Sequence, residues 1–599
     1  MTALASSLGG TVAKTVEPTP QGYAYDKEPE VRVAGFSDAA WEGARAVSRE
    51  LGRLRGEPIV VVDCYPGVTP DVLDLVREAI QPDEVLLAQD MYRDQGQIDA
   101  MLAPHVTQDR VRGVMFYGSL QDFVDPVRLD ALRERLARAR RASRRVLVYG
   151  VGAALVCAEG ILVYCDLARW QIQLRYRAGA CNFLQDNATE DALRKFKRGY
   201  FMDWRVADRH KRTLLERIDY LLDTNDATCP RLATGDAFRA GLAQVVRRPF
   251  RLVPYFDPGV WGGTWMRDHF GLDPKAPNYA WSFDGVPEEN SLYLRIGGVR
   301  IEVPAQDAVL SHPTELLGAA NYAHFGAEFP IRFDLLDTMG GQNLSLQVHP
   351  STDYIHTHYG MAYTQDESYY ILDAEPGAGV YLGLREGVDP ARMMGALRAA
   401  NRGEASFSAE EFVNRIPAHL HDHFLIPAGT VHCSSAGCMV LEISATPYIF
   451  TYKLWDWGRL GMDGLPRPIH LDDGEKNIRW DRTTTWVQRN LVDQAREVGS
   501  GDGWVEERTG LHELEFIESR RVTATVPTSH DAGAGVHVLN LVEGAAAVVR
   551  SPRHAFEPFE VHYAETFIVP AAAGAYVVEP ARPGERIRLV KAYVRNATA

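Results

Sequence analysis

The 599-residue chain is poor in cysteine, and its few cysteines lack the spacing of a structural framework. It has seven, an odd number, with no Cys-x-x-Cys pair. In a chain of this size, that pattern favours reduced thiols in the cytosol over disulfides. The N-terminal 22 residues lack a basic start followed by an apolar run, so we expect no secretory signal peptide. These absences predict a cytoplasmic protein.

Positive charge and uninterrupted apolar runs are also scarce. The formal net charge of −15 argues against a nucleic-acid partner, although one local basic pocket could still hold a small anion. Residues 146–167 are long and apolar enough to be tested as a membrane span, but Glu159 and three glycines interrupt them. Two buried strands around a glycine-rich turn or short helix explain this stretch better. We therefore expect no membrane partner.

The first 245 residues predict an α/β domain with a mainly parallel sheet, because strand and helix patterns alternate there. The strand patterns are 58–64, 85–88, 114–117 and 218–225, and the helical patterns are 70–80 and 126–142.

From residue 246 the strands become short and frequent, with many glycine-containing turns, as in a β-sandwich or barrel. Three further parts are expected: a β-rich domain formed by 246–387 and 417–505, a helical insert at 388–416 with helices at 390–401 and 409–416, and a second, smaller β-barrel at 506–599. The chain is thus predicted to be multidomain, α/β at its start and β-rich afterwards.

Four polar residues in the β-rich part could converge on a metal ion. Gln347 and His349 are two apart, so on a strand they project from the same face. Glu367 opens another strand pattern, and His432 follows a tight turn. Two imidazoles, a carboxylate and an amide oxygen suit a borderline divalent ion such as Zn²⁺ and leave positions open for substrate. A single histidine is more often structural, but the four residues together favour a metal site.

Four segments carry a family resemblance: Gln347-Val-His-Pro, Glu367-Ser-Tyr-Tyr-Ile-Leu, Pro427-Ala-Gly-Thr-Val-His and Tyr452-Lys-Leu-Trp-Asp-Trp-Gly-Arg. Together they resemble the type I, cupin-fold mannose-6-phosphate isomerases. The resemblance begins near Pro254 and extends over roughly residues 250–599. The third segment alone would indicate only a cupin, whereas the combination of all four is specific.

The resemblance implies a fold, a site and a reaction. The β-rich domain would be a cupin, or jelly-roll, barrel, and the C-terminal domain a smaller cupin-like barrel. The reaction would interconvert mannose 6-phosphate and fructose 6-phosphate through an enediolate, with a metal stabilising the developing charge and a carboxylate moving the proton. Zn²⁺ or another divalent metal would be bound by Gln347, His349, Glu367 and His432, and the catalytic residues would be Glu442, Lys453 and Arg459.

Two departures from the family pattern concern charge near the site. The chain has Gln365-Asp-Glu where the family usually has Lys-Thr-Glu, and Lys453 where it usually has arginine. Lysine keeps the charge but loses the planar fork that grips phosphate. One alternative is therefore an isomerase or epimerase of another sugar, with or without a phosphate group. Another is a non-catalytic, metal-bearing cupin that senses a sugar, although Glu442 together with the four ligands argues against it.

The N-terminal region contains two loops that could approach a phosphate. Residues 60–68 lie where a phosphate-binding loop would follow a first strand, but they lack the Gly-Lys-Ser/Thr ending. Residues 149–154 are a glycine loop whose N–H groups could form an anion nest. The region faintly resembles a degenerate, uridine-kinase-like P-loop domain. A non-catalytic scaffold, through which the chain could form a homo-oligomer, is favoured over nucleotide or sugar sensing and over a working kinase.

Overall fold

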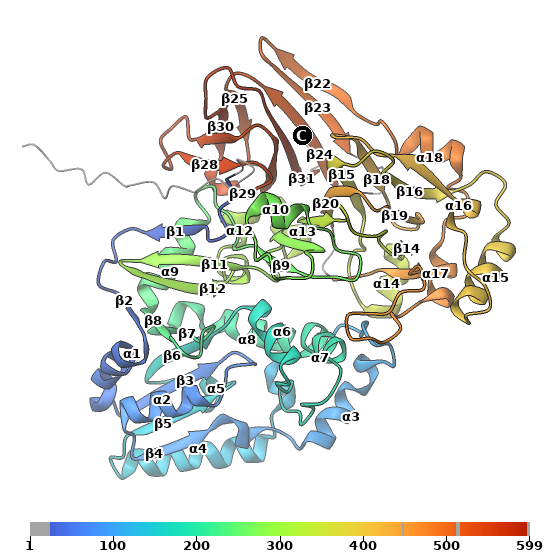
Figure 1. Ribbon diagram of the computed structural model, residues 1–599. Helices are drawn as coiled ribbons and strands as arrows, with labels where there is room; N and C mark the ends of the chain where they lie inside the picture. Colours follow the sequence, from blue (N-terminus) through green and yellow to red (C-terminus); the bar gives the residue numbers. More distant parts are fainter. Residues whose placement is uncertain (1–23, 446–447, 511–514, 596–599) are drawn as a thin grey trace, which may run out of the picture.

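The computed structural model describes residues 24–445, 448–510 and 515–595 (Figure 1). The protein is multidomain and β-rich, with several sheets and helices between them. Residues 1–22, in which no signal peptide is expected, lie outside the described residues. All seven cysteines lie within them, and each is a free thiol.

The N-terminal α/β region is built on a seven-stranded sheet, drawn in blue to green in Figure 1. Its order is β2 (Ala40–Glu42), β8 (Arg231–Thr234), β7 (Tyr220–Asp223), β6 (Ile161–Asp166), β3 (Ile59–Cys64), β5 (Val146–Gly150) and β4 (Glu84–Leu87). The five strands from β7 to β4 are parallel, as predicted, and β8 and β2 join them antiparallel. Every residue of β3 is buried, which accounts for its continuous apolar run. Helices α2 (Asp71–Ile80) and α4 (Pro126–Arg141) lie close to their predicted ranges.

The predicted strand at 114–117 is wrong. These residues are not paired in a sheet; the N–H of Val114 donates to the carbonyl of His105, and the N–H of Met115 donates to the carbonyl of Tyr359. Met115 and Phe116 of this run are buried between separate parts of the molecule, whereas Tyr117 is 68% exposed.

The apolar stretch 146–167 folds as predicted, with β5, the short helix α5 (Ala153–Val156) and β6. Within the three described ranges, no helix combines the length and apolar character needed to cross a membrane.

Two antiparallel sheets make up the first barrel of the β-rich part. The first has the order β18 (His423–Ile426), β15 (Glu367–Ala374), β20 (Cys438–Ser444), β13 (Arg332–Asp337), β10 (Trp281–Gly285) and β9 (Tyr255–Asp257). The second has the order β17 (Val413–Pro417), β16 (Gly379–Leu384), β19 (His432–Ser434), β14 (Leu346–Val348) and β21 (Tyr452–Trp455).

The helical insert lies between β16 and β17. Helix α15 (Pro390–Asn401) occupies its predicted range. The second predicted helix, 409–416, is too long: α16 (Ala409–Phe412) ends where β17 begins to pair with β16. Edge pairing with β16 overrides the helical pattern of residues 413–416.

Two further antiparallel sheets lie at the C-terminus, where a second, smaller barrel is predicted. One sheet contains β22 (Arg496–Gly501), β23 (Trp504–Gly510), β24 (Ile517–Ala524), β31 (Ile587–Val594), β26 (His537–Glu543) and β29 (Thr566–Val569). The other contains β25 (Thr528–Asp531), β30 (Ala575–Pro580), β27 (Ala546–Arg550) and β28 (Phe559–His562). These strands enclose their own apolar cluster.

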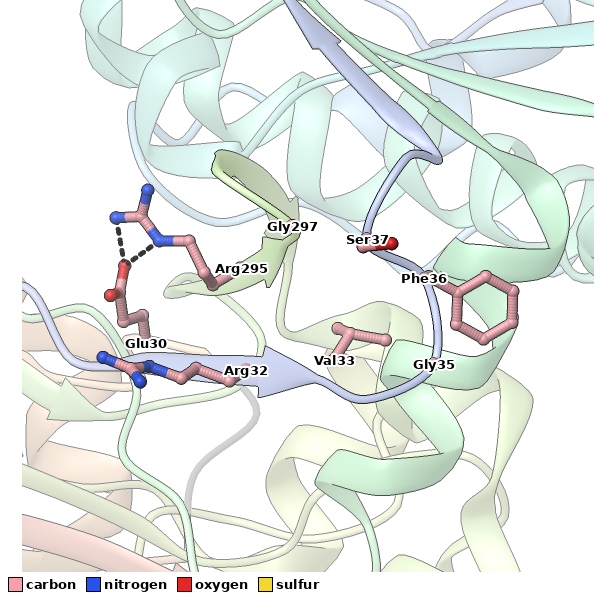
Figure 2. A pocket seen from close by; sticks show the side chains of 8 residues that line it. All are labelled: Glu30, Arg32, Val33, Gly35, Phe36, Ser37, Arg295 and Gly297. Atoms are coloured by element: carbon pink, nitrogen blue, oxygen red, sulfur yellow. Dashed lines mark hydrogen bonds and ion pairs between the residues drawn. The ribbon is translucent and has the colours of Figure 1, made fainter. Parts of the chain in front are cut away.

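The start of the chain pairs with its middle. Strand β1 (Glu30–Val33) lies parallel to β11 (Ser291–Ile296), which pairs with β12 (Val299–Pro304). This small sheet borders an open groove in which Glu30 pairs with Arg295 (Figure 2). None of the residues lining the groove belongs to the predicted site. The pairing also crosses residue 245, and the expected domain limits stay a prediction.

Candidate metal centre

Strand register brings the predicted metal ligands together from both sheets of the first barrel. Gln347 on β14 lies directly opposite His432, the first residue of β19. His349 follows the end of β14, and Glu367 opens β15 in the facing sheet. Nitrogen or oxygen atoms of His349, Glu367 and His432 all lie within 4.8 Å of one another. The three side chains are at most 1% exposed, so they meet inside the barrel.

Backbone carbonyls orient both imidazoles. Nδ1 of His349 lies 2.7 Å from the carbonyl oxygen of Phe450, and Nδ1 of His432 lies 2.9 Å from that of Thr430. A carbonyl oxygen only accepts, so each Nδ1 must carry the proton and donate. The Nε2 atoms of neutral rings then point lone pairs into the barrel, as metal-binding histidines do.

When both rings are neutral, three acceptors therefore converge on one point. Nε2 of His349 lies 3.2 Å from Oε2 of Glu367, and Nε2 of His432 lies 2.8 Å from Oε1. His349 Nε2 and Glu367 Oε1 are buried and have no hydrogen-bond partner among the described residues. Lone pairs this close repel unless a cation lies among them. Two imidazoles and a carboxylate are a donor set that fits Zn²⁺ or a similar divalent ion.

The carboxylate of Glu367 and the amide of Gln347 each have further polar neighbours. Burial raises the pKa of Glu367, but when His349 and His432 carry a proton on Nε2 their positive charge outweighs this effect and holds the pKa well below its usual range. Gln365 donates from Nε2 to Oε2 of Glu367 at 2.8 Å. The amide of Gln347 lies 3.2 Å from Nε2 of His432, and half a turn of that amide would present its oxygen instead.

Two acidic side chains, Asp334 and Glu442, lie in the sheet that carries Glu367. Asp334 on β13 and Tyr369 on β15 pair with Glu442 on β20, so their side chains share one face of the sheet. Burial, with Asp334 and Glu367 nearby, raises the pKa of Glu442 well above its usual range. Burial also raises the pKa of Asp334 to about 6, against the opposing effect of Arg332. Sequence patterns did not single out Arg332 or Asp334, because each is an ordinary strand residue until β13 and β20 pair.

Cations gather beside the metal-binding cluster. Lys453 on β21 pairs in register with Gln347, so the two side chains are neighbours. Burial, with Arg467 nearby, lowers the pKa of Lys453 to about 7. Arg459 and Arg467 both contact the buried carboxylate of Asp456. The sequence indicated Arg459 but not Arg467. The importance of Arg467 follows only from the fold, which places it against the buried carboxylate of Asp456.

Residues 354–359 belong to a helix. Helix α14 (Thr352–Tyr359) carries His356 and His358, and both are exposed. They are not part of the buried cluster.

The glycine loop of the N-terminal region is already filled by a carboxylate. Asp63, at the end of β3, accepts from the N–H of Gly152 at 3.0 Å and from that of Ala154 at 2.8 Å. Nε2 of His210 lies 2.9 Å from the same carboxylate. A side chain thus occupies the expected anion nest, and nothing supports the faint resemblance to P-loop kinases.

The fold and this donor set define a β-rich protein with a candidate metal centre between two antiparallel sheets. The chain is homologous to mannose-6-phosphate isomerases over about 40% of its length. It is 26% identical over 266 residues to the probable mannose-6-phosphate isomerase GmuF of Bacillus subtilis, covering 42% of this chain and 74% of that protein. It is 27% identical over 226 residues to the mannose-6-phosphate isomerase of Streptococcus mutans, covering 37% and 66%. This homology supports a sugar isomerase family at modest identity.

Other comparisons concern the fold and the N-terminal region. The mannose 6-phosphate isomerase structure from Bacillus subtilis matches with a TM-score of 0.48 and 19% identity, over 58% of this chain and 100% of that one. A putative mannosephosphate isomerase from Archaeoglobus fulgidus matches with a TM-score of 0.44 and 19% identity, over 58% and 98%. Residues 43–247 match the family model of a domain of unknown function, DUF8485.

Proposed function

We propose that the protein is a metal-dependent aldose–ketose isomerase that interconverts mannose 6-phosphate and fructose 6-phosphate through an enediolate. The observation that carries the proposal is the convergence of His349, His432 and Glu367 on one point inside a barrel. Homologues named as mannose-6-phosphate isomerases support the same reaction.

The metal would be held by His349, Glu367 and His432, with the amide of Gln347 as a fourth ligand. When bound, a divalent ion supplies positive charge that stabilises the two oxygens of an enediolate. The hydrogen bonds from both Nδ1 atoms to backbone carbonyls support this assignment, because they set the tautomer that a metal requires.

Glu442 would move the proton between C1 and C2 of the sugar. It lies in the same sheet as Glu367 with its side chain on the same face, and a raised pKa suits a carboxyl group that must both take up and release a proton. The same carboxyl group could serve both directions of the reaction. Asp334, its neighbour in the sheet, would help to keep that pKa high.

The cations beside Gln347 would bind the phosphate. Lys453, Arg459 and Arg467 surround a single carboxylate, Asp456, so the cluster has an excess of positive charge when Lys453 is protonated. A bound phosphate dianion would itself favour protonated Lys453. Nη1 of Arg459 is buried without a hydrogen-bond partner among the described residues and is available to such a ligand.

One observation favours another sugar, with or without a phosphate group. The neutral amide of Gln365 contacts Oε2 of Glu367, where the resembling family usually has a lysine two residues before its glutamate. The site then has less positive charge near the metal than a phosphorylated substrate would favour.

The test is a panel of phosphorylated and free aldoses assayed with metal-loaded protein in D₂O. We expect conversion of mannose 6-phosphate to fructose 6-phosphate, deuterium incorporation at C1 or C2, and loss of both on chelation. Turnover of free mannose alone would favour the second candidate. Binding of a sugar phosphate without deuterium exchange would instead indicate a sensor.

A further inference from the structure

The N-terminal α/β region packs a loop against the barrel beside the metal centre. Residues 107–117, here called the docking loop, carry Arg112, which is 1% exposed. Its guanidinium donates to the carbonyl of Thr451 and lies 4.3 Å from the ring centre of Tyr452. Asp109 of the same loop pairs with Arg112 at 3.2 Å. A buried arginine that contacts a backbone carbonyl and an aromatic face is a specific anchor.

A second anchor holds the segment that precedes β21. Tyr448 donates its hydroxyl hydrogen to the carbonyl of Val111 at 2.7 Å. Its ring also packs against Tyr200 and Phe201 of the N-terminal region, with ring centres 4.3 and 4.7 Å away. The segment 448–453 is therefore fixed at both ends by the N-terminal region.

This segment contacts the metal centre directly. The carbonyl of Phe450 accepts the hydrogen bond from Nδ1 of His349, and Lys453 is the in-register neighbour of Gln347. The docking loop also reaches the far side of Lys453: Asp109 lies 3.5 Å from Nε2 of His470, whose backbone N–H donates to the carbonyl of Lys453.

We propose that the docking loop positions the metal centre, with Arg112 as the positioning residue. It holds segment 448–453 so that the carbonyl of Phe450 fixes the His349 ring and Lys453 stays beside Gln347. The N-terminal region is then a structural part of the site. This inference rests on the metal centre of the proposed function but not on the identity of the sugar.

The test compares Zn²⁺ affinity in wild-type protein and in Arg112→Ala, measured by competition with a chromophoric chelator and without any sugar. Because the carbonyl that orients His349 loses its support, we expect Zn²⁺ to bind about 10- to 100-fold more weakly. The visible spectrum of the Co²⁺-substituted protein should change as well, since it reports ligand geometry. Arg112→Lys keeps the charge but not the planar fork and should recover part of the affinity.

The matched control is Tyr117→Phe. Tyr117 also lies on the docking loop and donates to the barrel, but to the carbonyl of Gly360 and not to segment 448–453. It should bind Zn²⁺ like wild type. A folded Arg112→Ala variant whose Zn²⁺ affinity stays within about threefold of wild type would overturn the proposal.

Tyr448→Phe decides the matter if Arg112→Ala does not fold. It removes only the hydroxyl contact to Val111 and keeps the packed ring. A weaker Zn²⁺ affinity and an altered Co²⁺ spectrum would support the proposal, and wild-type values for both would reject it. Failure of wild-type protein to turn over any sugar would count against the proposed function only, because these measurements contain none.

Discussion

His349 and His432 differ from the other described histidines in the partners of their two ring nitrogens. Each directs Nε2 at one carboxylate while its Nδ1 is engaged by a backbone carbonyl. We predict that His349→Ala and His432→Ala each lose both bound metal and isomerase activity. Both should stay folded, because the remaining histidine still contacts Glu367 and the backbone pairing of the strands is unchanged.

Elemental analysis of purified protein measures this outcome, and circular dichroism reports folding. His356→Ala is the control, since His356 is exposed on α14 and lies outside the cluster. Full stoichiometric metal in both His349→Ala and His432→Ala would refute the ligand set.

Glu442 allows a prediction that separates metal binding from catalysis. The change Glu442→Gln keeps the shape of the side chain but cannot exchange a proton. Metal content should stay at the wild-type level, while kcat falls by about 10²- to 10⁴-fold, as expected when a general base is lost. Steady-state kinetics combined with deuterium exchange at C1 or C2 provide the measurement. Near-normal turnover would exclude Glu442 as the proton carrier.

Among single residues, the sequence could indicate the side chains able to bind a metal. It could not indicate those whose role depends on which strands pair. The structure brings Gln347, His349, Glu367 and His432 together, and their role as metal ligands stays a prediction. Asp334 was not foreseeable, because its significance arises from the register of β13 with β20.

Strands and helices were predictable where their local pattern agreed with their surroundings. Strand β3 is buried along its whole length, and α15 begins at Pro390 behind a capping Asp389. Residues 114–117 have a similar apolar run to β3, yet their backbone bonds go to separate parts of the molecule. A local pattern reports that a segment is buried but not which partner buries it.

Strand β18 carries a buried histidine that should make stability depend on pH. His423 has no hydrogen-bond partner at either ring nitrogen among the described residues, and burial, assisted by Arg521, lowers its pKa to about 3. The unfolded chain, with a pKa near 6.5, binds a proton between about pH 6.5 and 3 that the folded protein does not. His423 therefore leaves stability unchanged above this window and costs stability as the pH falls through it.

The measurement is the difference in thermal midpoint between pH 7 and pH 5 for wild type and for His423→Leu. We expect the leucine variant to lose less stability on acidification than wild type. His419→Leu, at an exposed position in the preceding turn, should behave like wild type. Equal pH dependence in wild type and His423→Leu would contradict the assignment.

At the scale of the whole molecule, the contacts that join the N-terminal region to the rest could not be read from the sequence. Strand β1 pairs with β11 about 260 residues later, and Arg112 reaches Thr451 across the barrel edge. Both depend on the packing of completed elements. Charge pairs buried between such parts are the most sensitive points, because neither partner can be hydrated if the other is lost.

Lys211 forms two deeply buried ion pairs that join the N-terminal region to the chain beyond residue 300. It lies on α8 (Trp204–Leu214) and contacts Asp166 at the end of β6 and Asp307 on α11 (Gln306–Ser311), and all three residues are at most 1% exposed. We predict that Lys211→Met destabilises the protein by about 3–5 kcal/mol at pH 7, because it leaves two buried carboxyl groups without a cation. Burial raises the pKa of Asp307 well above its usual range, so protonation at pH 5 should reduce the defect.

Urea unfolding followed by tryptophan fluorescence provides the measurement. Adding Asp166→Asn and Asp307→Asn to Lys211→Met should restore most of the lost stability, since no unpaired charge then remains. Lys476→Met, which breaks an exposed pair with Asp473, should cost less than about 1 kcal/mol.

Because the triad joins β6 to α11, Lys211→Met should also separate the unfolding of the N-terminal sheet from that of the barrels. A single unchanged transition in Lys211→Met would mean that the N-terminal region and the barrels are held together by their apolar contacts alone.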